Sequence, residues 1–301
     1  MSFERTWTKL LGKISRAPRR WGWGEPDASY VSQRLVSDLR SYERLYPALE
    51  DAAQRRQFYE HLRAAKLALS PVMDVEGGQY ERVGDQEADG GYVMLKWKLP
   101  EPSERIAYSI GICDDVTWDK DLAQRGYQVY MYDHTIEGLV ESHPNFHFFT
   151  IGICGEPKVD KCQTLAEMVA SNGHTQQKNM ILKIDVEGAE HASFNACTPE
   201  LLQQFSQIVV EWHRLTDYKD SKNILNAIQR LNQTHQAIHI HGNNFSPTVG
   251  RVADIELPEV LEMTYLRRDL AHFIPSQRFF PTPLDRPCDK TLLDWELGYW
   301  T

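Results

Sequence analysis

Three carboxylate residues lie within six positions directly after a mostly apolar stretch of the sequence. Residues 180–184 lead into Asp185, Glu187 and Glu190. Like charges this close are costly unless a metal ion, a proton or another cation is shared among them. Glu187 and Glu190 also suit the start of a helix, where negative charge is favoured. The pattern therefore indicates a functional role for Asp185 before the other two.

Further polar side chains follow the next apolar stretches. Glu211 and His213 end one stretch, and His241 and Asn243 end another. A histidine and a carboxylate on neighbouring strand ends can form a general base or a metal site. Two catalytic arrangements are open. Either His213 removes a proton and a carboxylate orients it, or a divalent ion such as Mg²⁺ binds Asp185 and Glu211, with Asn243 as a further ligand.

A turn with a single glycine, Gly111, ends the first apolar stretch of this part of the chain. The GxGxxG fingerprint of dinucleotide-binding proteins is absent there, so a pyrophosphate cradle is poorly supported. Asp133 stands at the end of the next apolar stretch, where an acidic residue can accept hydrogen bonds from ribose hydroxyls. A nucleoside without phosphates is the profile of S-adenosylmethionine. The alternative is that Asp133 only caps a turn.

The elements that must position these residues alternate along the chain from about residue 105. Alternating apolar strands and helices predict a parallel sheet covered by helices on both faces. In such sheets, ligands bind beyond the carboxyl ends of the strands, which is where the polar residues fall. The expected strands are 106–112, 128–132, 146–151, 180–184, 207–210, 237–241 and 260–267. The expected helices are 117–125, 164–171, 189–205 and 221–232.

The N-terminal part, residues 1–75, is expected to be helical, with helices near 30–46 and 49–69, ahead of a main domain at 76–301. Its opening segment, 1–20, is strongly basic and carries apolar residues at helical spacing. Such a helix can lie on an anionic membrane surface. It can equally pack on its own domain or on a second subunit, so a homo-oligomer is the rival interpretation.

The composition of the chain favours some classes of protein and argues against others. The chain has 301 residues, of which 42% are hydrophobic and 25% charged, as expected of a globular protein with one large domain or a domain and an extension. No run of ~18 apolar residues and no secretory signal is present. A net charge of −9 argues against a nucleic-acid partner. The five cysteines lack a CxxC pair, so we expect reduced thiols, no disulfide and a cytoplasmic location.

Together these segments resemble the FkbM-type group of class I S-adenosylmethionine-dependent methyltransferases, and more closely the methyltransferase-like subgroup that includes methyltransferase-like protein 24. The similarity covers about residues 78–285. The stretch from Lys183 to Glu190 is its most specific mark. The other marks are Arg82, Asp89 to Tyr92, Tyr108 to Gly111, Tyr132-Asp133, Glu211 to His213, Asn243-Asn244 and the segment from Pro258 to Arg267.

The resemblance implies an α/β, Rossmann-like fold with seven strands, the last one antiparallel, and methyl transfer from S-adenosylmethionine to oxygen. It implies that Gly111 and its neighbour Ser109 contact the cofactor, that Asp133 binds its ribose, and that the loop at Gly152 borders its adenine. Asp89 to Tyr92 would help close the site. The turn after Gly111 is more acidic than usual for the family, which makes Arg82 the candidate counter-charge for the methionine carboxylate.

The resemblance further implies a sugar hydroxyl on a glycan or glycosylated metabolite as the methyl acceptor. Tyr92, Trp118 and Trp212 are aromatic residues that can stack on a sugar face, although core packing explains aromatic residues equally well. The leading alternative is a catalytically degenerate methyltransferase fold that serves as a binding or scaffold module. A nicotinamide-dependent oxidoreductase is disfavoured by the missing glycine fingerprint.

Overall fold

The computed structural model describes residues 51–96, 99–156, 161–246, 249–252 and 255–301. The basic segment 1–20 and the expected helix 30–46 lie outside the described residues. None of the described helices is both long enough and apolar enough to cross a membrane.

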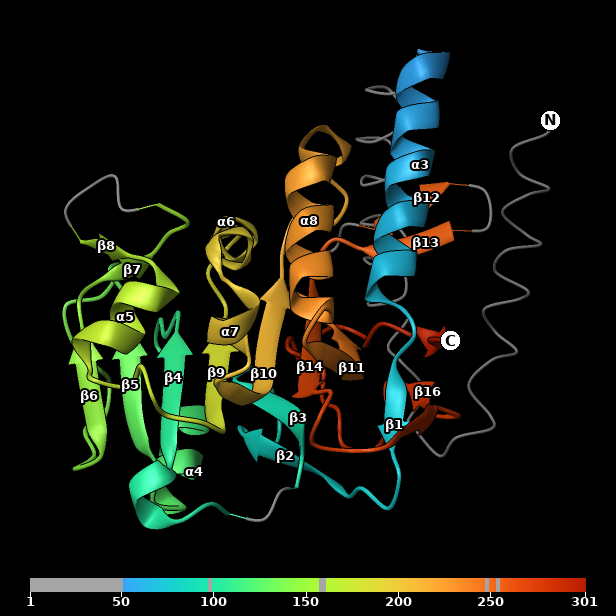
Figure 1. The fold of residues 1–301 in the computed structure, drawn as a ribbon. Coiled ribbons are helices and arrows are strands. Elements are labelled where there is room, and N and C mark those ends of the chain that lie inside the picture. Colours follow the sequence, from blue (N-terminus) through green and yellow to red (C-terminus); the bar gives the residue numbers. More distant parts are fainter. Residues whose placement is uncertain (1–50, 97–98, 157–160, 247–248, 253–254) are drawn as a thin grey trace.

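A seven-stranded sheet forms the centre of the molecule (Figure 1). Its strands lie in the order β11-β14-β10-β9-β4-β5-β6. All run in one direction except β14, which pairs antiparallel with both β10 and β11. This confirms the predicted seven-stranded, mostly parallel α/β sheet. The bounds are β4 (Ile106–Ile110), β5 (Gln128–Tyr132), β6 (Phe146–Phe149), β9 (Met180–Ile184), β10 (Phe205–Trp212), β11 (His235–Gly242) and β14 (Leu261–Arg267).

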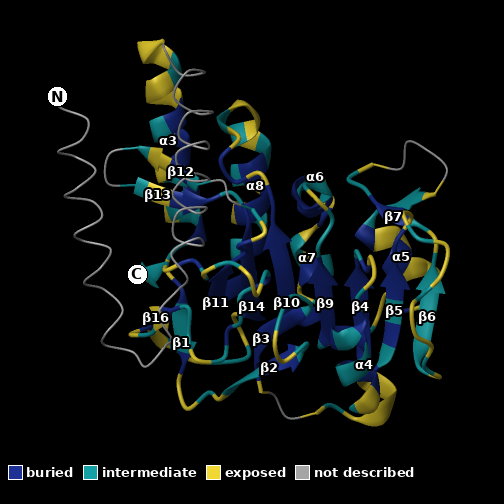
Figure 2. Cartoon of the chain, turned by 180° about the vertical axis from the view of Figure 1, so that it is seen from behind, coloured by how far each residue is buried: buried dark blue, intermediate teal, exposed yellow. Residues whose placement is uncertain are grey.

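Helices cover both faces of the sheet because both faces of its strands are apolar. On β4, Tyr108 and Ile110 join one core cluster and Ala107 joins the other, as expected for side chains that alternate along a strand. The first face is covered by α3 (Ala52–Leu69), α5 (Leu165–Ser171), α6 (Ala189–Ala196), α7 (Pro199–Leu202) and α8 (Ser221–Asn232). The second face is covered by α4 (Thr117–Gln124) and the hairpin of β2 (Tyr80–Gly84) and β3 (Gly91–Leu95). Figure 2 shows the central strands as almost wholly buried.

Helix α3 belongs to the same body as the sheet. Its buried residues Phe58 and Leu62 join the larger core cluster, and the helix lies beside α8 and the hairpin of β12 (Val249–Val252) and β13 (Ile255–Pro258) (Figure 1). The strand β1 (Met73–Val75) pairs with β15 (Phe273–Pro275) from the far end of the chain. Helix α3 and strand β1 therefore pack with the main domain.

One expected helix is two helices in the structure. The prediction of a helix over 189–205 is wrong, because the chain turns at Cys197 and starts again at α7. Thr198 caps α7 through its side chain, and Pro199 stands at the first helical position, where its missing N–H costs nothing. Phe205 then begins β10.

Two cysteines correct the expectation of five reduced thiols. Cys154 and Cys162 form a disulfide, because the short strands β7 (Gly152–Ile153) and β8 (Cys162–Gln163) pair and bring the two residues together. Their spacing matches no common motif, so the sequence carried no signal of it. The cysteines left as free thiols are Cys113, Cys197 and Cys288.

The C-terminal segment returns to the edge of the sheet that β11 forms. It contains β16 (Phe279–Phe280) and β17 (Gly298–Tyr299), which pair with each other. Trp300 packs in the main core cluster, and its backbone oxygen accepts a hydrogen bond from Val72, the residue before β1. The segment thus ties both ends of the described chain to one body.

Candidate active site

A cavity of about 620 Å³ opens at the carboxyl ends of the parallel strands. This lies within the ~300–1,000 Å³ typical of small-molecule sites. Residues from the ends of β9, β10 and β11, from the turn after β4 and from the β2–β3 hairpin line it. The position is the one expected for a ligand of an open α/β sheet.

Asp185, Glu211 and His213 converge in this cavity. Nε2 of His213 lies 3.4 Å from Oε1 of Glu211 and 3.8 Å from Oδ1 of Asp185. One polar atom from each residue lies within 4.8 Å of the other two. Because Ile184 pairs with Val210 on the neighbouring strands β9 and β10, the residues that follow, Asp185 and Glu211, come side by side. The structure thus brings together the three residues expected to be catalytic.

Four carboxylates lie near the ring of His213. The backbone N–H of His213 donates to Oε1 of Glu190 over 2.8 Å, and the same oxygen lies 3.4 Å from the ring atom Nδ1. Burial opposes a charge on His213, but the nearby carboxylates of Glu190 and Glu211 outweigh it and raise the pKa of His213 to about 11. An imidazolium has donors only. This raised pKa favours His213 as a proton donor over the role of base.

The pKa values of Glu211 and Asp185, the two carboxyl groups beside His213, are raised. Burial, and after it the proximity of Asp185, raises the pKa of Glu211. Burial also raises the pKa of Asp185, against the opposing charges of Lys183 and His213. A carboxylate whose pKa lies nearer to neutrality is a better proton acceptor once ionised. The group therefore combines one proton donor with two potential proton acceptors.

Asn243 reaches the site but does not present its oxygen to the carboxylates. Its Nδ2 donates to Oε1 of Glu211 over 2.8 Å, and its Oδ1 accepts from the backbone N–H of Phe245 over 2.9 Å. For a metal ion, the convergent set in the structure is Asp185, Glu211 and His213, with Asn243 outside it.

Lys183 is a cation of this cavity that was not predicted to belong to the site. It lies in β9, where all five residues are buried. Its Nζ donates to the backbone oxygen of Gly111 over 2.8 Å and lies 5.6 Å from the ring centre of Tyr92. The sequence offered one sign of this role, a lysine inside an otherwise apolar strand. A buried ammonium group requires polar partners.

The turn of the β2–β3 hairpin forms one wall of the cavity. Asp89, Gly90 and Tyr92 line it, which is the position that the family resemblance implied. Gly90 has a φ of +80°, and a Cβ there would lie 2.4 Å from Oδ2 of Asp115, so the hairpin closes directly on the turn after β4. Burial raises the pKa of Asp89 to about 6.

Ser109 and Gly111 do not line the cavity. The side chain of Ser109 is fully buried in β4. Gly111 has a φ of +84°, and a Cβ there would lie 1.6 Å from the backbone oxygen of Asp185. The close approach of the two strand ends therefore explains this glycine without a ligand.

Asp133 caps the turn after β4 and also lies outside the cavity lining. One carboxylate oxygen accepts from the backbone N–H groups of Ile112 and Cys113, over 2.8 and 2.9 Å. The other accepts from the backbone and the hydroxyl of Thr135, over 2.7 and 2.6 Å. Four accepted hydrogen bonds fill the capacity of a carboxylate. The turn-cap alternative describes what the structure shows.

Arg82 and Gly152 have local partners as well. Arg82 donates to the backbone oxygens of Asp85 and Ala88, over 2.6 and 2.5 Å, and so holds the hairpin turn in shape. Gly152 packs against the ring of His134, whose Nδ1 would lie 2.7 Å from an added Cβ. Neither lines the cavity, whereas Lys183 does.

The aromatic residues divide between the cavity and the core. Tyr92 and Trp118 line the cavity, together with Phe245, whose exposed fraction is 57%. Trp212 instead lies in the core, where its indole N–H donates to the hydroxyl of Tyr265 over 3.0 Å. The indole nitrogen of Trp118 is buried and has no hydrogen-bond partner among the described residues.

The cavity is strongly acidic. Eight of its lining residues carry a carboxyl group and three are basic. Such a lining attracts cations and repels phosphates. It suits a positively charged sulfonium with an attached nucleoside better than it suits a dinucleotide.

Comparison with solved structures finds distant similarities. A protein from Listeria monocytogenes, provisionally assigned as an S-adenosylmethionine-dependent methyltransferase, is 10% identical over 56% of this chain and 94% of its own, with a TM-score of 0.34. A protein from Streptococcus thermophilus, provisionally assigned as a hemolysin, is 11% identical over 60% of this chain and 72% of its own, with a TM-score of 0.30. No curated protein matches the chain significantly. At this level of similarity, no site residue is carried over.

A family model gives the more specific result. The model described as the methyltransferase FkbM domain matches residues 98–242. The match begins just before β4 and ends with β11, so it spans every parallel strand of the sheet and includes Asp185, Glu211 and His213. The α/β sheet with its single antiparallel strand β14 is the Rossmann-like methyltransferase fold expected from the sequence. Residues 98–242 of this chain thus form an FkbM methyltransferase domain.

Proposed function

We propose that this protein is an S-adenosylmethionine-dependent O-methyltransferase that acts on a hydroxyl group of a sugar or a glycosylated metabolite. The observation that carries the proposal is the convergence of Asp185, Glu211 and His213 in an acidic cavity at the carboxyl ends of β9 and β10. The methyltransferase domain supplies the reaction class, and this group of side chains supplies what a hydroxyl acceptor needs.

The acidic lining supports the choice of cofactor. When bound, S-adenosylmethionine supplies a methyl group that is already activated on a sulfonium. The carboxylates of the cavity stabilise such a positive charge. The ammonium group of Lys183 gives the methionine carboxylate a counter-charge within the same cavity, in place of Arg82.

Activation of the acceptor falls to the three convergent residues. Because His213 holds its proton, we assign proton acceptance to Asp185, which is more open to the cavity than Glu211, with side-chain exposures of 28% and 6%. His213 and Glu211 then orient Asp185 and the acceptor hydroxyl. Alignment of the hydroxyl with the methyl group is the main contribution that a protein makes to such a displacement.

A divalent ion on the same three residues is the second arrangement. It would lower the pKa of the hydroxyl and hold the acceptor. Removal of metal ions with EDTA followed by return of Mg²⁺ separates the two arrangements. Activity that survives EDTA supports Asp185 as the base without a metal.

Sugar as acceptor rests on the resemblance and on the aromatic residues at the cavity. Tyr92 and Phe245 offer apolar faces beside a lining that is otherwise rich in carboxylates. This combination suits a sugar ring, which presents both apolar C–H faces and hydroxyl groups. Comparison of small metabolites with and without the active enzyme, searched for a methyl increment, identifies the acceptor.

The decisive experiment is calorimetric titration with S-adenosylmethionine and S-adenosylhomocysteine, followed by a methyl-transfer assay. We expect both ligands to bind and Asp185→Asn to lower the transfer rate by about 10²–10⁴. Glu141→Gln removes a surface carboxylate that pairs with Lys120, and serves as a control that should leave the rate unchanged. Absence of binding of either ligand at millimolar concentration contradicts the proposal.

The saturated carboxylate of Asp133 favours the second candidate, a binding module without catalytic activity. With its four hydrogen bonds inside the protein, Asp133 has no acceptor capacity left for a ribose in this conformation. A folded chain that binds neither S-adenosylmethionine nor S-adenosylhomocysteine would support this candidate over the enzyme.

A further inference from the structure

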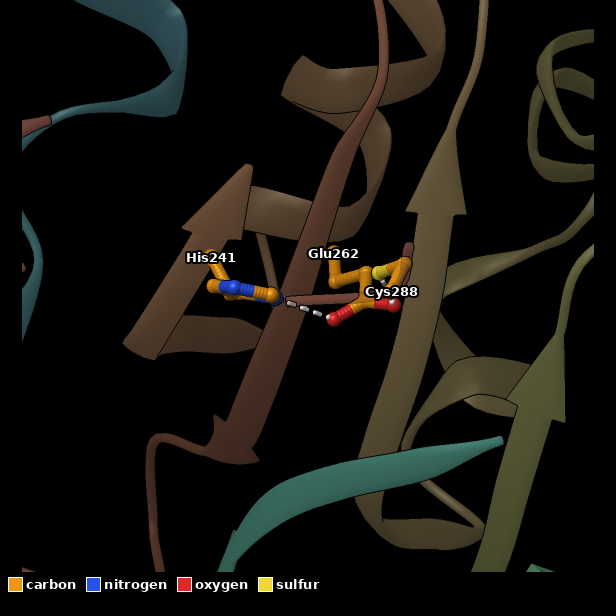
Figure 3. A group of neighbouring side chains, drawn as sticks. All are labelled: His241, Glu262 and Cys288. Atoms are coloured by element: carbon orange, nitrogen blue, oxygen red, sulfur yellow. Dashed lines mark hydrogen bonds and ion pairs between the residues drawn. The ribbon is translucent and has the colours of Figure 1, made fainter. Parts of the chain in front are cut away.

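A second group of metal-binding side chains lies outside the candidate active site. It consists of His241 at the end of β11, Glu262 in β14 and Cys288 in the C-terminal segment (Figure 3). All three are buried, with exposed fractions of 2%, 5% and 4%. One nitrogen, one oxygen and the sulfur lie within 4.8 Å of one another. None of the three lines the candidate active-site cavity.

The three side chains point toward one another, as Figure 3 shows. Nδ1 of His241 lies 2.7 Å from Oε2 of Glu262, and Sγ of Cys288 lies 3.4 Å from Oε1 of the same carboxyl group. Glu262 thus stands between the imidazole and the thiol. The two strands hold His241 and Glu262 as directly paired residues, so their distance is set by the sheet and not by a flexible loop.

A fourth residue orients the histidine from the other side. Nε2 of His241, the ring nitrogen remote from Glu262, lies 3.0 Å from Oδ1 of Asp294. Histidine ligands in metal sites commonly use the second ring nitrogen in this way, donating to a carboxylate that fixes the ring. Asp294 therefore leaves Nδ1 directed at Glu262 and Cys288.

We propose that His241, Glu262 and Cys288 bind a zinc-type transition-metal ion. Imidazole, carboxylate and thiolate are all zinc ligands, and three of them together with one water molecule would complete its tetrahedral coordination. The thiolate selects against Mg²⁺ and Ca²⁺, which prefer oxygen ligands. Binding requires Nδ1 of His241 and Sγ of Cys288 to give up their protons.

Such an ion would attach the C-terminal segment to the sheet. His241 and Glu262 belong to β11 and β14, whereas Cys288 lies well beyond Arg267, where the last long strand ends. The segment already makes neighbouring contacts with the end of β11: Asp289 exchanges backbone hydrogen bonds with the side chain of Asn244. A metal ion bound by Cys288 would add a coordinate bond between the C-terminal segment and the strands β11 and β14.

Cobalt is the probe for the first experiment, because a cobalt–thiolate bond gives a near-ultraviolet charge-transfer band. The full chain, freed of metal by a chelator, is titrated with Co²⁺. We expect the band in the wild-type protein and its loss when Zn²⁺ displaces Co²⁺. No band and no stoichiometric Zn²⁺ by elemental analysis would overturn the proposal and leave His241 as a buried ion pair between Glu262 and Asp294.

Two matched variants identify the thiol. Cys288→Ala and Cys197→Ala each remove a buried free cysteine, but Cys197 donates to the backbone oxygen of Ser193 and is not part of the group. We expect the band to vanish in Cys288→Ala only. Zn²⁺ should raise the melting temperature of the wild type and of Cys197→Ala but not of Cys288→Ala, since only a competent site gains stability from the ion. A band that persists in Cys288→Ala contradicts the assignment.

A third variant keeps the test valid if Cys288→Ala does not fold. Asp294→Asn retains all three ligands and alters only the group that orients His241. Loss of such a partner typically weakens metal binding by about 10–100-fold. An unchanged affinity for Co²⁺ in Asp294→Asn would contradict the role of His241 Nδ1 as a ligand.

Discussion

Gly111→Ala adds a methyl group where the turn after β4 touches the backbone at Asp185. The added Cβ would lie 1.6 Å from the backbone oxygen of Asp185 and 2.7 Å from its carbon. Carbon atoms in folded proteins do not approach other atoms so closely, so one strand end must move. The same turn also accepts a hydrogen bond from Lys183 at the oxygen of Gly111, and that contact would shift with it.

The size of the effect follows from two separate costs. The φ of Gly111 is +84°, and a residue with a side chain loses ~1–2 kcal/mol in that left-handed region. Overpacking a tight contact adds ~1–3 kcal/mol. We therefore expect a loss of about 2–5 kcal/mol in the free energy of unfolding.

Gly173→Ala isolates the first cost. Gly173 follows α5 with a φ of +76°, and an added Cβ there meets nothing within 4 Å. Both variants carry the cost of the backbone conformation, but only Gly111→Ala carries the cost of the contact. Gly111→Ala should thus be less stable than Gly173→Ala by ~1–3 kcal/mol.

The assay is urea unfolding followed by tryptophan fluorescence, with each midpoint compared at unchanged slope. Equal midpoints for the two variants would refute the close approach of the two strand ends. A loss of S-adenosylmethionine binding in Gly111→Ala without a loss of stability would show a direct ligand contact, as the family resemblance implied.

Three further outcomes test other parts of the structure. Leu62→Ala in α3 should lower the free energy of unfolding by ~2–5 kcal/mol, and a loss below ~1 kcal/mol would show that α3 is not part of the core. Although burial opposes it, hydrogen bonding to Cys113 and Thr135 lowers the pKa of Asp133. The stabilisation by the ionised carboxylate is therefore present above pH 3.8 and is lost as the pH falls through the lowered pKa. Asp133→Asn should be ~1–3 kcal/mol less stable than the wild type at neutral pH, and a difference that stays constant at all pH values would contradict this. NMR titration should find His213 protonated well above pH 6.5, and titration near 6.5 would refute the carboxylate cluster.

The alternation of elements and the polar residues at strand ends could be read from the sequence, because both depend on local patterns. Apolar strands separated by amphipathic helices leave a parallel sheet as the one arrangement that buries them all. The strands at 128–132 and 180–184 and the helix at 221–232 were predicted to the residue. Asp185 and Glu211 came together because they follow neighbouring parallel strands, whose carboxyl ends share one edge.

The partners of individual side chains were decided only by the tertiary structure. Asp133 and Arg82 look like ligand-binding residues in the sequence, but backbone groups of nearby turns occupy both. The sequence places Lys183 in a strand but does not show its partner. The register of β9 beside β4 brings its ammonium group to the turn at Gly111. Cys288 meets His241 and Glu262 although it is far from both in the sequence. Each such contact depends on how distant segments pack, and a single-step shift in register or a different turn would place another atom there.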